Sequence, residues 1–103
     1  MAIWRAITLK EDGVRAWDVE LTPNDPTSDL RMVSGDFCSV SVDGGPVDVR
    51  GNLAPDAKTY PLRDTQGVPL TNLSNTLETI GHTIDAIQVT GLGHVTLYAR
   101  RDT

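Results

Sequence analysis

Apolar and polar residues alternate with a period of two over much of this chain. A half-buried β-strand gives this pattern because its successive side chains point to opposite faces of a sheet. Cys38, Val40 and Val42 fall on one such face, and we expect all three to point into the core. An Asp-Gly-Gly-Pro turn signal follows, and the alternation then resumes. These features predict a hairpin over residues 37–53.

The two ends of the chain repeat this arrangement. The C-terminal third alternates on both sides of a Gly-Leu-Gly turn at residues 91–93, which predicts a second hairpin over residues 87–100. Near the N-terminus, residues 3–9 and 14–21 are each typical of a strand, and the Glu-Asp-Gly sequence at 11–13 suits a tight turn between them.

The remaining segments are shorter or less regular. Residues 22–29 form a polar stretch with two prolines, which predicts a surface loop. Residues 60–62 suit a short edge segment, and residues 64–67 suit a turn. Residues 73–80 place Leu, Leu and Ile at helical spacing, which allows one or two helical turns. The chain therefore predicts a single all-β domain, residues 1–103, with a β-sandwich or jelly-roll-like fold of about seven or eight short antiparallel strands.

Composition narrows the classes of partner. The 103 residues contain 14 Asp and Glu against 9 Lys and Arg, a formal charge of −5 at pH 7. Nucleic-acid binding needs a basic surface to neutralise phosphates, so we expect no nucleic-acid partner. No window reaches the length of apolar sequence that a membrane helix needs, and the N-terminal residues do not resemble a signal peptide. With one cysteine, an intrachain disulfide is excluded, and we expect a chain that is made and kept in a cytosol.

Residues that could carry chemistry are few. His82 and His94 lack the close ligand spacing of a zinc site, and we expect both to be solvated surface histidines. Cys38 lies in phase with core valines, which favours an inert buried thiol over a nucleophile. Aspartates lie mainly at turns, where they bond to the backbone. We therefore expect no catalytic residue, no metal ion and no cofactor, and a protein that works by binding rather than as an enzyme.

The two tryptophans divide between core and surface. Trp17 is in phase with Val19 and Leu21, which predicts a core position. Trp4 is out of phase with Ile3 and is predicted to face away from the core, where aromatic side chains anchor protein interfaces. Prolines limit the conformations of the loop that follows residue 21, so its ordering on a partner costs less entropy. The predicted partner-binding residues are Trp4, Pro23, Asn24, Asp25 and Pro26.

The second half of the chain resembles small structural proteins of tailed phages. In these, an extended segment is followed by a Leu-x-Asp-x-x-Gly-x-Pro-Leu-Thr turn, here residues 62–71, and by a closing hairpin from Val-Thr-Gly to Val-Thr-Leu, here residues 89–97. A tyrosine-and-arginine pattern that often precedes the last hairpin is replaced here by Ala86 and Gln88. The N-terminal half carries no matching motif.

The resemblance implies a virion protein with a β-sandwich or jelly-roll fold, in particular a capsid decoration (cement) protein. Its expected partners are the phage major capsid protein and other virion proteins, with self-association into a homo-oligomer. Its expected location is the capsid surface, after synthesis in the host cytoplasm. Two alternatives stay open: a phage tail or head-completion protein, and a carbohydrate-binding β-sandwich module, which would need exposed coplanar aromatic side chains.

Overall fold

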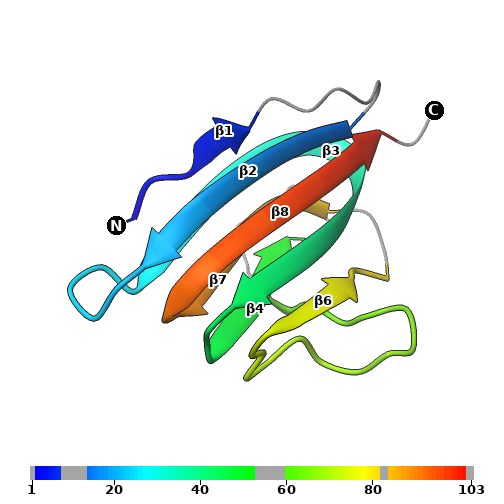
Figure 1. Cartoon of the computed structure of the whole chain (residues 1–103). Helices are drawn as coiled ribbons and strands as arrows, with labels where there is room; N and C mark the ends of the chain where they lie inside the picture. The colour runs from blue at the N-terminus through cyan, green and yellow to red at the C-terminus, as the bar shows by residue number, and fades with distance from the viewer. Residues whose placement is uncertain (1, 8–13, 53–59, 82–83, 102–103) are drawn as a thin grey trace.

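The protein is an antiparallel β-sandwich (Figure 1). The structure, a computed structural model, describes residues 2–7, 14–52, 60–81 and 84–101. Within these ranges the chain forms eight strands and no helix. The strands are β1 (Arg5–Ile7), β2 (Val14–Leu21), β3 (Thr27–Asp43), β4 (Val47–Asn52), β5 (Tyr60–Pro61), β6 (Thr76–Thr79), β7 (Ile84–Gly91) and β8 (Gly93–Arg101). The all-β sandwich predicted from the alternation is confirmed.

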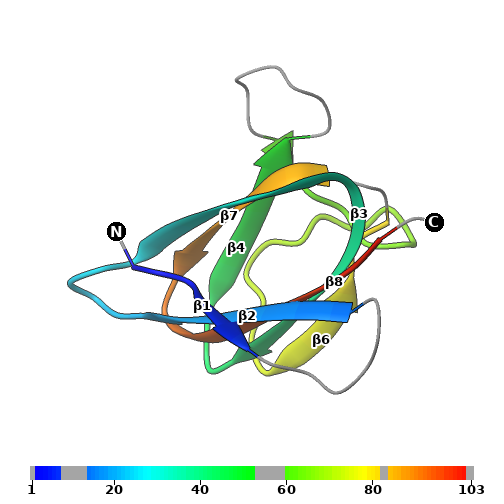
Figure 2. The same cartoon turned by 90° about the horizontal axis from the view of Figure 1, so that it is seen from above.

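The long strand β3 belongs to both layers of the sandwich. Its first part, Thr27–Arg31, pairs with β7, and its second part, Asp36–Asp43, pairs with β8. The register shifts between these parts, and Figure 2 shows β3 curving from one layer into the other. One layer has the order β1-β2-β8-β3-β6, and the other has the order β3-β7-β4-β5. The core lies between them and consists mainly of Val, Leu and Ile from the inward faces.

The structure contradicts the two hairpins predicted over residues 37–53 and 87–100. β4 pairs with β5 and β7 but not with β3, so residues 37–53 are not a hairpin. β8 pairs with β2 and β3 but not with β7, so residues 87–100 are not one either. Each turn instead forms a corner that carries the chain from one layer to the other. The N-terminal pairing of β1 with β2 is confirmed, whereas its turn at residues 11–13 lies outside the described residues.

Glycines explain why these two turns form corners. Gly44, Gly45, Gly91 and Gly93 all have positive φ, and the two corners pack backbone against backbone. A Cβ on Gly93 would lie 2.7 Å from the carbonyl oxygen of Asp43 and 2.8 Å from the amide nitrogen of Gly45. Only glycine permits both this backbone conformation and this close approach. The glycines that predicted hairpin turns therefore serve a contact between two layers.

Two other predicted segments differ in the structure. The loop predicted over residues 22–29 ends at residue 26, because Thr27 already begins β3 and Ser28 is fully buried. The weak helical prediction at residues 73–80 is wrong, because residues 76–79 form β6 against β3. The helical spacing is misleading here, since Ile80 is buried while Leu77 is 63% exposed. Cys38 is buried with Val40 and Val42 as predicted.

The phage-like motif at residues 62–71 forms a compact excursion from the core. Leu62 and Leu70 are buried at its base, and the amide of Leu70 donates to the carbonyl of Leu62 at 2.8 Å. At its tip, one carboxylate oxygen of Asp64 accepts hydrogen bonds from the amides of Gln66 and Val68, both at 2.9 Å. The turn predicted at residues 64–67 is confirmed, and the motif residues have structural roles.

Candidate binding surface

One layer of the sandwich carries a regular array of side chains on the side away from the core, most of them exposed or partly exposed, with Ala16 and Asp18 buried among them. We define the outer face as the side of β1-β2-β8-β3-β6 that points away from the core. Among the residues whose side chains the structure describes, pairing forms three rows that run across the strands. The first row is Ile7, Ala16, Tyr98, Ser39 and Thr79; the second is Arg5, Asp18, Thr96, Ser41 and Leu77; the third is Glu20, His94 and Asp43.

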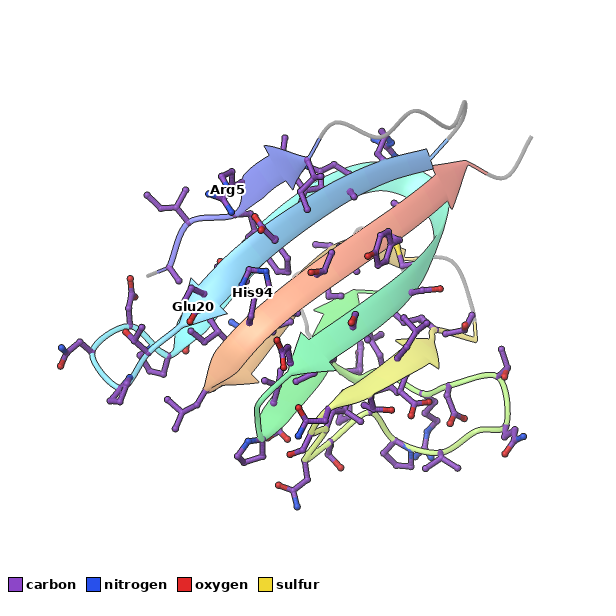
Figure 3. The ribbon with its side chains drawn as sticks, in the orientation of Figure 1. Arg5, Glu20 and His94 are labelled. Atoms are coloured by element: carbon purple, nitrogen blue, oxygen red, sulfur yellow. The ribbon has the colours of Figure 1, made fainter. Side chains whose placement is uncertain are left out.

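Within these three rows, the charged side chains gather at one end of the outer face. Arg5 on β1 binds Asp18 on β2 with both ends of its guanidinium, Nε to Oδ1 at 3.1 Å and Nη2 to Oδ2 at 2.9 Å. His94 on β8 places Nε2 3.2 Å from the same Oδ2 and Nδ1 3.1 Å from Oε2 of Glu20. We call these four residues the Arg5–His94 cluster. Figure 3 shows Arg5, Glu20 and His94 side by side on three neighbouring strands.

Asp18 is the centre of this cluster. Its side chain is only 9% exposed, whereas that of Arg5 is 77% exposed. The hydrogen bonds from Arg5 lower the pKa of Asp18 from its usual value, against the opposing effect of burial, and the same contact raises the pKa of Arg5. The carboxylate therefore stays ionised beneath a guanidinium and an imidazole, because these donors replace the water that burial removes.

His94 differs from the solvated histidine that the sequence predicts. The side chain is 40% exposed and does lie on the polar face of β8, but each ring nitrogen faces a carboxylate oxygen. A histidine that acts as a general base needs a ring nitrogen within reach of its substrate. In the structure, both nitrogens of His94 contact carboxylates of the protein itself. His82, the other histidine, lies outside the described residues.

The middle of the outer face carries no charge. Ser39, Ser41, Thr79 and Thr96 carry small hydroxyl side chains here, and Tyr98 and Leu77 lie next to them in the same rows. Tyr98 is 38% exposed and Leu77 is 63% exposed. A shallow hollow of about 460 Å³ lies beside Leu77, lined by Ser41, Val42, Asp43, Asn75, Thr76 and Leu77. We call Ser39, Ser41, Thr79, Thr96, Tyr98 and Leu77 the hydroxyl strip.

The structure reverses the orientation predicted for Trp4. Trp4 is partly buried and packs against the core, whereas Ile3 is 87% exposed. The reason is that residues 2–5 cross between layers: the amide of Ala2 donates to Thr27 on β3 at 2.9 Å, while Arg5 pairs with β2. In a segment that crosses between layers, the alternation of apolar and polar residues does not indicate which side chains point into the core. Trp17 packs against the core, as predicted.

The other predicted partner-binding residues lie together in the turn between β2 and β3. Thr22 and Asp25 exchange backbone hydrogen bonds of 3.2 and 3.0 Å, with Pro23 and Asn24 exposed at the tip. Pro26 is also exposed, and its carbonyl accepts a bond of 2.9 Å from the amide of Gly91. The turn is therefore ordered by the chain itself, and the role of these residues in binding a partner stays a prediction.

Other kinds of site can be compared with the described residues. Within them, no three His, Cys, Asp or Glu side chains group as metal ligands would. They also include no helix long and apolar enough to cross a bilayer. A pocket of about 220 Å³ is lined by the Arg5–His94 cluster together with Ile3 and Val19. The cluster and the hydroxyl strip thus remain the candidate functional features of the outer face.

Comparison with solved structures identifies the architecture. The cupin domain of Cnp3 from Schizosaccharomyces pombe superposes with a TM-score of 0.51 over 96% of this chain, at 12% sequence identity. The fold is jelly-roll-like. This chain spans 60% of the length of that domain's chain, and at this identity the likeness concerns the fold alone. A search against models of protein families finds no match, and neither does a search of curated proteins.

Sequence reasoning missed the Arg5–His94 cluster. Alternation alone predicts that the side chains of Glu20 and His94 point to the face opposite their core neighbours. This outward facing is the signal that the sequence provides for the cluster. The cluster depends on β8 lying beside β2, a pairing between segments more than seventy positions apart. No local pattern encodes that pairing.

Proposed function

We propose that this chain is a virion structural protein of a tailed phage, a capsid decoration protein that binds the head shell through its outer face. The observation that carries the proposal is the hydroxyl strip, an uncharged and partly apolar surface on a protein with a net charge of −5. The centres of protein interfaces are depleted in charge and enriched in aromatic residues such as tyrosine, whereas their rims are polar.

Two further features support this proposal. The motifs at residues 62–71 and 89–97 resemble those of small tailed-phage structural proteins, and the jelly-roll-like sandwich is the fold that this resemblance implies. Decoration requires many copies on a repeating lattice, so modest affinity of each copy is sufficient when copies also contact one another.

The direct test is whether the chain co-purifies with intact virions at a copy number in fixed ratio to the major capsid protein. Mass spectrometry of gradient-purified particles measures that ratio. Absence of the chain from virions of the phage that encodes it would refute the proposed function.

A second test addresses the surface. Capsids that lack the chain are mixed with the parent or with a Leu77→Ser, Tyr98→Ser variant, and bound protein is measured by sedimentation. Truncation of an interface anchor typically costs about 2 kcal/mol, which corresponds to about thirtyfold weaker binding. Val68→Ser is the matched control, because Val68 is 53% exposed on the separate 62–71 excursion. Equal binding by the double variant and this control would exclude the hydroxyl strip as the contact.

A further inference from the structure

The contact between Glu20 and His94 depends on a proton. Both ring nitrogens face carboxylate oxygens, Nε2 that of Asp18 at 3.2 Å and Nδ1 that of Glu20 at 3.1 Å. An imidazolium carries a hydrogen on each nitrogen and donates to both carboxylates, whereas a neutral ring carries only one. In the neutral ring, the other nitrogen turns a lone pair toward a negative oxygen, so one of the two contacts must open.

The surroundings decide which contact opens. Asp18 has a side chain only 9% exposed, so it loses most if it gives up a donor. The Glu20 side chain is 64% exposed, and water can replace the imidazole for it at little cost. We therefore expect a neutral ring to keep its hydrogen on Nε2 toward Asp18 and to release Glu20.

The charged groups around His94 come from three strands. Asp18 and Glu20 face it from β2, Arg5 lies beyond Asp18 on β1, and Asp43 is its register partner on β3. Two carboxylates therefore contact the ring, a third belongs to its register partner, and the one guanidinium nearby is bound to Asp18. With a charged ring these groups have a formal charge of −1, and with a neutral ring they have a formal charge of −2, so loss of the ring proton makes this end of the outer face more negative.

We propose that Glu20 and His94 form a proton-controlled latch between β2 and β8. In the closed latch, an imidazolium holds Glu20 against the outer face. In the open latch, the neutral ring keeps Asp18 and frees the Glu20 carboxylate, whose charge is then no longer compensated by an imidazolium. Histidine is the side chain whose ordinary titration falls between about pH 5 and 8, so pH is the variable that tests the latch. The inference concerns the chain itself and does not depend on the proposed function.

Nuclear magnetic resonance on the isotope-labelled chain tests the latch. As the pH rises through the titration of the His94 ring, the side-chain carboxyl carbon of Glu20 should change its chemical shift with the same midpoint. His82→Gln assigns the ring signals and should leave this coupled response intact. His94→Gln, which keeps a polar side chain without a titratable charge, should abolish it. A Glu20 signal that stays constant while the His94 ring titrates would overturn the latch.

A double-mutant cycle measures the strength of the same contact. Folding equilibrium constants are determined for the parent, Glu20→Gln, His94→Gln and the double variant at both ends of the pH range. The coupling should be about two- to fivefold at the acidic end and absent at the alkaline end, as for an exposed ion pair. Equal coupling at both ends would contradict a proton-controlled contact. If His94→Gln fails to fold, the pH midpoint of the His94 ring titration is compared between the parent and Glu20→Gln. The loss of the Glu20 charge should shift this midpoint, and an unchanged midpoint would likewise overturn the proposal.

Discussion

Leu62 anchors the excursion at residues 62–71, and its truncation tests the account of the core. Its side chain is fully buried, and its amide donates to the carbonyl of Val49 on β4 at 3.2 Å. The amide of Val49 in turn donates to the carbonyl of Leu70 at 2.9 Å. Leu62 and Leu70 thus fix both ends of the excursion to the same strand, and Leu62→Ala keeps these backbone bonds while removing the buried side chain.

The magnitude follows from what the substitution removes. Leu→Ala deletes three buried carbon groups, each worth about 0.8 kcal/mol in transfer from water, or about 2.4 kcal/mol together. The cavity left behind adds to this loss, and measured Leu→Ala changes in cores span about 2–5 kcal/mol. A domain of this size loses about 4–8 °C in Tm for each kcal/mol. We expect Leu62→Ala to lower Tm by at least about 10 °C.

Thermal and urea unfolding followed by circular dichroism measure this loss. Leu77→Ala is the matched control, because the same atoms are removed from a side chain that is 63% exposed. The control should change the free energy of unfolding by less than about 0.5 kcal/mol. Similar losses for the two variants would refute the assignment of Leu62 to the core and of Leu77 to the surface.

Three other predictions follow from buried or constrained groups. Cys38 should resist a thiol reagent in native buffer and react in urea, and Cys38→Asp should prevent folding because the chain would bury a charge. The lowered pKa of Asp18 contributes stability above the ordinary aspartate pKa of about 3.9, and this contribution is lost as the pH falls toward the lower folded value. Asp18→Asn should flatten that part of the pH dependence of urea unfolding. Gly91→Ala should cost more stability than Gly67→Ala, because both positions have positive φ but only the Cβ at Gly91 meets neighbouring backbone.

Strand positions could be predicted from the sequence, and strand partners could not. Val14–Leu21 is a strand with the predicted bounds, and Cys38, Val40 and Val42 are buried as their spacing indicates. The alternation reports only that one face of a strand is buried. It does not report which strand lies alongside, so turn signals suggested hairpins where β3 instead joins two layers.

The candidate site shows the same division. The outward facing of Glu20 and His94 follows from their strands, but their contact follows from the β2–β8 register. The phase of residues 3–9 alone predicts a surface position for Trp4, and this prediction is wrong. The bonds that tie Ala2 to Thr27 and Ser28 turn this segment across the edge of the sandwich, and they depend on residues that are distant in sequence.

The position of β8 between β2 and β3 has a consequence for synthesis. β2 is translated well before β8, the strand of residues 93–101 that pairs with it along its length. Until these residues have been translated, β2 and the second part of β3 both lack β8, the strand that lies between them and pairs with each. Pairings between such distant segments are slow to form because a long loop must close first. A nascent chain therefore exposes the β8-facing edges of β2 and of the second part of β3 until residues 93–101 are available to pair with them.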